Sequence, residues 1–252
     1  MTGAFCWYDL STTDTAAAAS FYSTLLGWTA APHRVGDESY TMWQQGETGF
    51  GGLMKLPPQA AAMGAPPHWM GYVWVDDAEA AVARAVALGA RVYVPATTIS
   101  PDVGRFAVLA DPQGATFAVY QSARPSDGSD WKCPVAWHEC YTTDVEGAIA
   151  FYSGLFGWEK TDSMEMAGGA GVYQMFGKGG KTFGGMMLKP AEMPMPAWLY
   201  YFSVPSADEV ATRAKALGAH VILGPMDVPG GGRIAVALDP QGASFAVYSH
   251  PG

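Results

Sequence analysis

The sequence predicts an α+β protein built from four successive modules, each a strand, a helix and three more strands (βαβββ). A block that runs from Trp7 to Trp28 returns as Trp137 to Trp158 with a constant offset of 130 residues. Each block is followed by a second module with the same order of strands and helix but a different sequence, and this second module also occurs twice. The offset changes only between elements, over a range from 128 to 133 residues, so insertions fell in loops and the chain is a tandem duplication.

The side chains of the first module justify each of its elements. Asp14 follows the first strand, and its carboxylate is well suited to capping a helix. Apolar residues then recur at helical spacing, and Gly27 is a typical helix end. Alternating aromatic and polar residues predict two strands before a Pro- and Ala-rich connector. The predicted elements are a strand at 4–10, a helix at 16–26, strands at 39–44 and 49–55, and the connector at 57–67.

The second module repeats this plan with a different sequence. Its last hairpin turns at Asp111-Pro112-Gln113-Gly114, where Pro presets φ and Gly permits a tight return. The predicted elements are a strand at 68–75, a helix at 78–88, and strands near 91–94, 105–110 and 115–121. A polar stretch at 125–130 is typical of a linker. We therefore predict two domains, at 1–123 and 131–252.

Composition excludes several classes of function. The formal charge is −9 and no cluster of Lys and Arg occurs, so the electrostatic footprint that nucleic-acid binding needs is absent. No segment approaches the roughly 18 consecutive apolar residues of a membrane span, and the first 20 residues do not resemble a signal peptide. We expect a cytoplasmic protein, monomeric or homodimeric, with neither a nucleic-acid nor a membrane partner.

The three cysteines do not indicate a disulfide, a metal site or a catalytic nucleophile. Cys6, Cys133 and Cys140 form neither a disulfide framework nor a CxxC pair. Cys6 and Cys140 occupy the first strands of the two repeats, where a cysteine most often serves as a small buried apolar residue. No base is evident beside either one.

Two motifs carry a resemblance to a known family. FYxxLxGW follows the first strand of each half, and DPxGAxFAVY closes each half. Together with the four modules, these motifs resemble the glyoxalase/bleomycin-resistance/extradiol-dioxygenase superfamily, also called the vicinal oxygen chelate fold, in its tandem two-domain bacterial branch. The resemblance covers essentially the whole chain. It implies that modules pair their curved sheets into half-barrels whose concave face holds a small ligand.

The resemblance also implies where a metal would bind. Metal-dependent members place His or Gln on the first strand of each module and Glu near the end of the last strand. The matching positions here are Trp7, Met70, Ala118, Trp137, Leu199 and Ala246, none of which supplies a ligand atom for a hard or borderline metal. We therefore predict no cofactor and no metal. The alternative is a non-standard divalent site drawing on Asp9, His68, His138 or Glu139, although His138 and Glu139 are strand neighbours and should face opposite sides.

The side chains that share the family's ligand face predict an aromatic pocket. The predicted ligand-binding residues are Trp7, Tyr72, Trp74, Tyr120, Trp137, Tyr141, Tyr201 and Tyr248. Asp9 and Glu139 hold the same position in the two repeats, and a carboxylate among aromatic rings is costly to bury unless it is paired or protonated. They are the candidate catalytic residues. The alternative is a structural role, with each carboxylate bonded to backbone or to Arg105 and Arg233.

Two functions follow from this pattern. The first is a small-molecule binding protein that holds an aromatic or amphipathic organic ligand in metal-free pockets, for sequestration or for resistance of the bleomycin-resistance kind. The second is a glyoxalase-like enzyme, a lyase or an isomerase, that uses Asp9 or Glu139 as acid or base.

Overall fold

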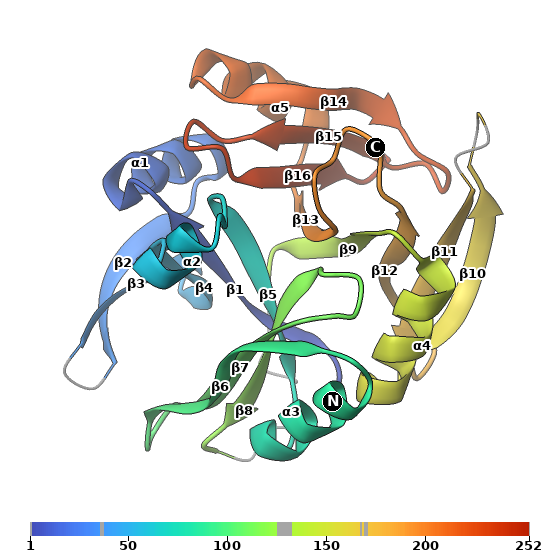
Figure 1. The fold of residues 1–252 in the computed structure, drawn as a ribbon. Helices are drawn as coiled ribbons and strands as arrows, with labels where there is room; N and C mark the ends of the chain where they lie inside the picture. The colour runs from blue at the N-terminus through green and yellow to red at the C-terminus, as the bar shows by residue number, and fades with distance from the viewer. Residues whose placement is uncertain (1, 36–37, 125–132, 167, 169–170, 252) are drawn as a thin grey trace. The chain divides into compact units, whose positions relative to one another are not determined.

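The computed structural model describes residues 2–35, 38–124, 133–166, 168 and 171–251 (Figure 1). The predicted linker at 125–130 lies outside the described residues. The first half contains β1 (Phe5–Thr12), α1 (Thr15–Leu26), β2 (Thr29–Val35), β3 (Glu38–Gln45), β4 (Thr48–Lys55), α2 (Pro58–Ala62), β5 (His68–Trp74), α3 (Ala78–Ala87), β6 (Arg91–Ser100), β7 (Gly104–Ala110) and β8 (Thr116–Ser122). The second half contains β9 (Val135–Thr142), α4 (Val145–Phe156), β10 (Glu159–Glu165), β11 (Val172–Lys178), β12 (Lys181–Leu188), β13 (Ala197–Ser203), α5 (Ala207–Ala216), β14 (His220–Asp227), β15 (Arg233–Leu238) and β16 (Ser244–Ser249).

The strands form two mixed eight-stranded sheets, which confirms the α+β class. Their orders are β2-β3-β4-β1-β5-β8-β7-β6 and β10-β11-β12-β9-β13-β16-β15-β14, so the second half repeats the topology of the first. The first strand of a module runs parallel to its last strand, as β1 does to β4 and β5 to β8. Four βαβββ modules are therefore present, as predicted.

The predicted caps position the repeated helices. Asp14 accepts a hydrogen bond from the backbone N–H of Ala17, and Asp144 accepts one from Gly147, both at 3.0 Å. Gly27 ends α1 with a φ of 73°. A residue with a Cβ rarely adopts this left-handed conformation, so the helix ends where glycine permits it.

The structure adds two elements to the prediction for the first module. β2 contains Pro32 and two alanines and shows no clear alternation, so the strand pattern is weak. It is an edge strand, where proline is tolerated because one side of the strand needs no donor. α2 occupies the predicted connector and begins at Pro58, a favoured first helical residue.

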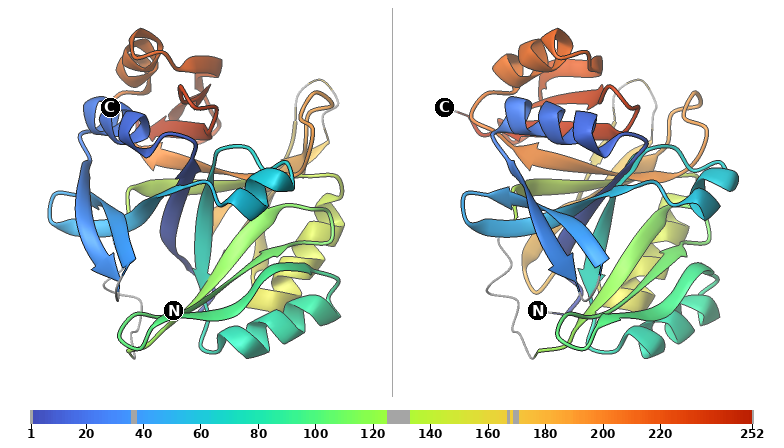
Figure 2. Two further views of the ribbon diagram at one scale, coloured as in Figure 1. Left: turned by 60° about the vertical axis from the view of Figure 1, so that its left-hand side comes forward. Right: turned by 90° about the vertical axis from the view of Figure 1, so that its left-hand side faces the viewer.

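The chain divides into two compact units, and each takes segments from both halves of the sequence. One, here called unit 1, contains Met1–Cys6, Gly71–Trp131 and Trp137–Trp198. The other, unit 2, contains Trp7–Met70, Lys132–Ala136 and Leu199–Gly252. Within unit 1 the helices α3 and α4 lie side by side, and within unit 2 α1 lies beside α5 (Figures 1 and 2).

A hydrogen-bonded chain of three side chains links distant segments of unit 2. Tyr22, the tyrosine of FYxxLxGW, is fully buried. Its hydroxyl accepts a hydrogen bond from the indole of Trp69 at 3.0 Å and donates one to Asp239 at 3.1 Å. The other Asp239 oxygen accepts backbone N–H groups of its own DPQG turn, at Gln241 and Ala243. The helix of the first module is thereby bonded to the last hairpin of the fourth.

Unit 1 repeats this arrangement. The indole of Trp198 donates to the hydroxyl of Tyr152, which donates to Asp111, each at 3.0 Å. Burial raises the pKa of Asp111 and of Asp239, while the hydrogen bonds from their turns act in the opposite direction. We call each arrangement a Trp–Tyr–Asp bridge. The aromatic residues of FYxxLxGW are core residues, since Phe21, Tyr22, Trp28 and their repeats are buried.

Candidate functional site

Trp7, Asp9 and Tyr40 form a hydrogen-bonded triangle in unit 2, here called cluster 1. The indole Nε1 of Trp7 lies 2.9 Å from Asp9 Oδ1 and 3.0 Å from the hydroxyl of Tyr40. That hydroxyl donates to the same Asp9 oxygen at 2.8 Å. Asp9 is only 4% exposed, whereas Trp7 and Tyr40 are half-buried. A buried carboxylate is thus met by two neutral donors, which offset its loss of hydration.

Unit 1 holds the equivalent group, cluster 2, made of Trp137, Glu139 and Tyr173. The indole of Trp137 donates to the hydroxyl of Tyr173 at 2.7 Å, and that hydroxyl is hydrogen-bonded to Glu139. Glu139 is 7% exposed and Tyr173 is 8% exposed. Trp137 is half-buried. The tyrosine stands between the indole and the carboxylate.

Strand geometry explains why these three residues meet. Residues i and i+2 of a strand share one face, which brings Trp7 and Asp9 together on β1. Asp9 is paired with Gly52 of β4, and Gly52 is paired with Met42 of β3. Tyr40, two residues before Met42, therefore lies on that face and reaches across the glycine strand. The second half pairs Glu139 with Gly185, and Gly185 with Met175, in the same way.

The glycines of the middle strand leave the space that each tyrosine fills. A Cβ at position 52 would overlap the hydroxyl of Tyr40 and lie 2.5 Å from Asp9 Oδ1. A Cβ at position 185 would overlap the ring of Tyr173. These glycines are therefore required by a close approach of side chains.

The two tyrosines stay protonated across the range in which proteins fold. Burial, followed by the negative charge of Asp9, raises the pKa of Tyr40. Burial and then Glu139 raise the pKa of Tyr173 in the same way. Both phenols are therefore hydrogen-bond donors to a carboxylate at neutral pH.

Tyr40 and Tyr173 were absent from the predicted site, although a signal for them existed. They are separated by 133 residues, the same offset that relates Gly51 and Gly52 to Gly184 and Gly185. A shared offset assigns the tyrosines and the glycines to one repeated feature. Only the strand register shows that this feature faces Asp9 and Glu139.

The other predicted ligand-binding residues lie on their strands as follows. In unit 1, Tyr72 is paired with Ala118 and Trp74 with Tyr120, while the hydroxyl of Tyr120 donates to the carbonyl of Val103 at 2.6 Å. In unit 2, Tyr201 is paired with Ala246, and Tyr248 is paired with Ser203. Tyr141 is half-buried and interacts electrostatically with Tyr173. The structure thus places Trp7 beside Asp9 and Trp74 beside Tyr120. It also places Trp137 and Tyr141 near Tyr173.

The arginines named as alternative partners of the carboxylates are engaged elsewhere. Arg105 forms an ion pair with Glu79 at 2.7 Å and also donates to the carbonyl of Ala96. Arg233 pairs with Asp208 and Asp227. Two donors to Asp9 are the aromatic side chains of Trp7 and Tyr40.

His138 and His68 are held by backbone carbonyls. The ring of His138 stacks on Phe5, with ring centroids 4.0 Å apart, and its Nδ1 donates to the carbonyl of Phe183 at 2.8 Å. Burial lowers the pKa of His138 to about 4, so the ring is neutral at pH 7. Nδ1 of His68 donates to the carbonyl of Pro66 at 2.7 Å, and burial lowers the pKa of this residue too.

The residues present do not fit the metal that the family resemblance implies. At the two first-strand positions, Trp7 and Trp137 direct N–H donors toward the carboxylate or tyrosine, and a donor hydrogen cannot bind a cation. Ala118 and Ala246 are fully buried and carry no ligand atom. Within the described part of the chain, no three His, Cys, Asp or Glu side chains come together as a metal-binding group.

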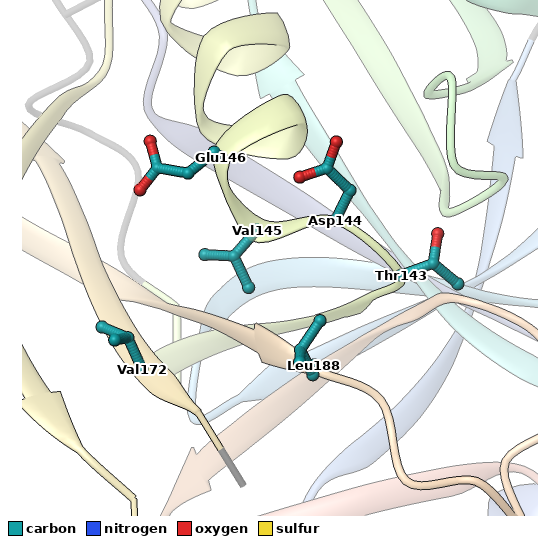
Figure 3. Close-up of a pocket in the computed structure, with 6 residues that line it drawn as sticks. All are labelled: Thr143, Asp144, Val145, Glu146, Val172 and Leu188. Carbon is teal, nitrogen blue, oxygen red and sulfur yellow. The ribbon is translucent and has the colours of Figure 1, made fainter.

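A hollow of about 330 Å³ lies in unit 1 beside the start of α4 (Figure 3). Its apolar wall is formed by Val145, Val172 and Leu188, and the carboxylates of Asp144 and Glu146 point away from these side chains. Asp144 caps α4 and Glu146 pairs with Lys160. None of the predicted site residues lines this hollow, and its two carboxylates are already engaged by the helix cap and by Lys160.

Two family descriptions match the chain. Residues 7–120 match a glyoxalase-like domain, and residues 135–247 match the glyoxalase/bleomycin resistance protein/dioxygenase superfamily. The described residues contain no helix long and apolar enough to cross a membrane.

Relatives and solved structures match over nearly the full length. The chain is 37% identical to a Mycobacterium tuberculosis protein provisionally named as the glyoxylase CFP32, over 96% of this chain and 92% of the relative. It is 31% identical to the anthracycline biosynthesis protein DauV of Streptomyces sp. strain C5, over 97% of this chain and 92% of the relative.

Solved structures show the same fold at low identity. The 2,3-dioxygenase LapB of Pseudomonas sp. KL28 gives a TM-score of 0.67 at 14% identity, over 100% of this chain and 94% of that one. The Mn(II)-bound glyoxalase of Novosphingobium aromaticivorans gives 0.65 at 15% identity, over 100% and 83%. With its tandem matching domains and full-length relatives, the chain belongs to the glyoxalase/bleomycin resistance protein/dioxygenase superfamily.

Proposed function

We propose that the protein binds a small, planar, hydroxylated aromatic molecule at each of its two clusters, without a metal. The observation that carries the proposal is a tryptophan on the first strand of both halves, at the position where the family resemblance implies a metal ligand. Each tryptophan is half-buried and is bonded into a group with a buried carboxylate. A partly exposed aromatic face with a fixed acceptor nearby favours a ligand that is flat and carries O–H or N–H donors.

The names of two relatives support this ligand class. DauV and DnrV are named as anthracycline biosynthesis proteins, and anthracyclines are polycyclic aromatic molecules with phenolic hydroxyl groups. Tyr72, Trp74, Tyr120, Tyr141, Tyr201 and Tyr248 are the further aromatic residues that we propose for ligand contact.

Calorimetric titration with 1,4-dihydroxyanthraquinone tests the proposal. We expect binding at two sites per chain, and weaker binding of anthraquinone, which has the same rings but no hydroxyl donors. Asp9→Asn and Glu139→Gln should each weaken one of the two sites by roughly tenfold, the worth of a hydrogen bond to a charged group. Equal affinity for both compounds, or no binding of either, would contradict the proposal.

A second candidate is a lyase or isomerase of glyoxalase type, favoured by the name of the 37% identical relative. Asp9 and Glu139 would then act as acid or base on the bound molecule. Product analysis of the titrated samples separates the two functions. Conversion that disappears in Asp9→Asn and Glu139→Gln favours the enzyme, whereas unchanged ligand recovered from the complex favours binding or sequestration.

A further inference from the structure

We propose that Tyr40 and Tyr173 are positioning residues, which hold the carboxylate and the indole of each cluster in the arrangement that meets the ligand. This inference rests on the proposed function and adds two residues to it. Neither tyrosine needs to touch the ligand for this role, because each acts through Asp9 or Glu139.

In cluster 1, one hydroxyl group serves both neighbours. The Tyr40 hydroxyl donates its hydrogen to Asp9 at 2.8 Å and presents its oxygen to the Trp7 indole at 3.0 Å. The indole also reaches Asp9 directly at 2.9 Å. The triangle is therefore closed, and loss of the phenol would leave Trp7 still bonded to the carboxylate.

Cluster 2 differs in a way that makes its tyrosine more important. The indole of Trp137 donates to the hydroxyl of Tyr173 at 2.7 Å, and the hydroxyl is bonded to Glu139. The phenol connects the other two side chains. Its removal would release the indole and remove a donor from the carboxylate at once, so the second cluster should depend more strongly on its tyrosine.

Glycines on β4 and β12, the strands between each tyrosine and its carboxylate, leave space for these phenols. The glycine beside each tyrosine leaves room for its ring or hydroxyl, and an added Cβ would overlap it. The space fixes where each phenol can lie, which is the property that a positioning residue needs.

A measurement without ligand tests the positioning directly. The indole N–H resonances of Trp7 and Trp137 are assigned in ¹H–¹⁵N spectra by comparison with Trp7→Phe and Trp137→Phe. We expect Tyr173→Phe to shift the Trp137 resonance and speed its exchange with solvent, and Tyr40→Phe to change Trp7 less. Tyr93→Phe, at a surface tyrosine that is 37% exposed, is the matched control. Indole resonances that stay unchanged in both cluster variants would overturn the inference.

A double-mutant cycle on ligand affinity tests whether each tyrosine acts through its carboxylate. For 1,4-dihydroxyanthraquinone we expect Tyr173→Phe and Glu139→Gln each to weaken one site roughly tenfold, and the double variant to weaken it no further. Additive losses, near a hundredfold, would show independent contacts and overturn the role. If the unchanged protein does not bind the compound, the proposed function fails, and the indole resonances still decide whether the tyrosines position the clusters.

Discussion

The hydroxyl of Tyr22 lies 3.1 Å from a carboxylate oxygen of Asp239, although the two residues are 217 positions apart in the chain. The tyrosine belongs to the helix motif of the first half, and the aspartate belongs to the hairpin motif of the second. Each family motif thus supplies one end of a buried hydrogen bond. This pairing gives the first of four expected outcomes.

Removal of the bridge hydroxyls should destabilise the protein. Tyr22→Phe leaves the buried Trp69 indole without its acceptor and takes one donor from Asp239, and Tyr152→Phe does the same to Trp198 and Asp111. We expect a loss of about 2 kcal/mol in the free energy of unfolding for each, measured by urea denaturation. Tyr93→Phe should change it by less than about 0.5 kcal/mol. Equal stability of all three variants would show that the bridges contribute nothing.

Acid should destabilise the protein through His138. Its pKa is about 4 when folded, against 6.5 for an ordinary histidine, so the unfolded chain takes up the proton first. The stabilising contribution is full above pH 6.5 and is lost as the pH falls from 6.5 to about 4, by about 3 kcal/mol in total.

His138→Phe isolates this contribution. A phenyl ring can keep the stack on Phe5 but cannot be protonated. The difference in unfolding free energy between the original protein and this variant should change across that pH window, because other titrating groups are common to both. A difference that stays constant with pH would mean that His138 is not the responsible group.

A methyl group on the middle strands should disturb the clusters. Gly52→Ala and Gly185→Ala place a Cβ where Tyr40 and Tyr173 lie, so we expect a loss of about 1–3 kcal/mol in stability and weaker binding of the aromatic ligand. Gly154→Ala is the control, because its Cβ, 3.1 Å from the nearest atom of Leu88, meets only the flexible end of that side chain and alanine favours the helix. If Gly52→Ala behaves like Gly154→Ala, Tyr40 does not fill the space assigned to it.

Divalent metals should not stabilise the folded protein. Ligand that binds only the native state raises the melting temperature, and the first-strand positions present indole N–H groups that repel a cation. Thermal melts after chelation, and after addition of Zn²⁺, Ni²⁺ or Mn²⁺, should coincide. Elemental analysis that finds near one tightly held metal per half, with turnover restored by that metal, would contradict the expectation.

The repeat and its motifs made the fold predictable, because apolar periodicity and capping residues can be recognised within a short stretch of sequence. Asp14, Gly27 and the DPQG turns lie where the sequence places them. β2 escaped prediction since an edge strand tolerates proline and needs no alternating pattern. The local sequence does not predict a strand that forms only because it pairs with a neighbouring strand.

Only the part of the candidate site that lies on one strand could be predicted, for a similar reason. Trp7 and Asp9 are neighbours on one strand, so their shared face follows from alternation. Tyr40 comes from a third strand, and its approach to Asp9 depends on the register of β1, β4 and β3. Register between distant strands is set by the whole sheet and cannot be derived from the side chains of one segment.

The crossed Trp–Tyr–Asp bridges also bear on how such a chain arose. The first half holds Tyr22 and Asp111, and the second holds Tyr152 and Asp239, so each half carries both ends of a bridge but closes neither with its own residues. Two copies of one half could form the same two hydrogen bonds, with the tyrosine of each copy donating to the aspartate of the other. In that sense the chain is arranged like a dimer of two similar halves joined into one polypeptide, in which each half supplies the partner for the other's tyrosine.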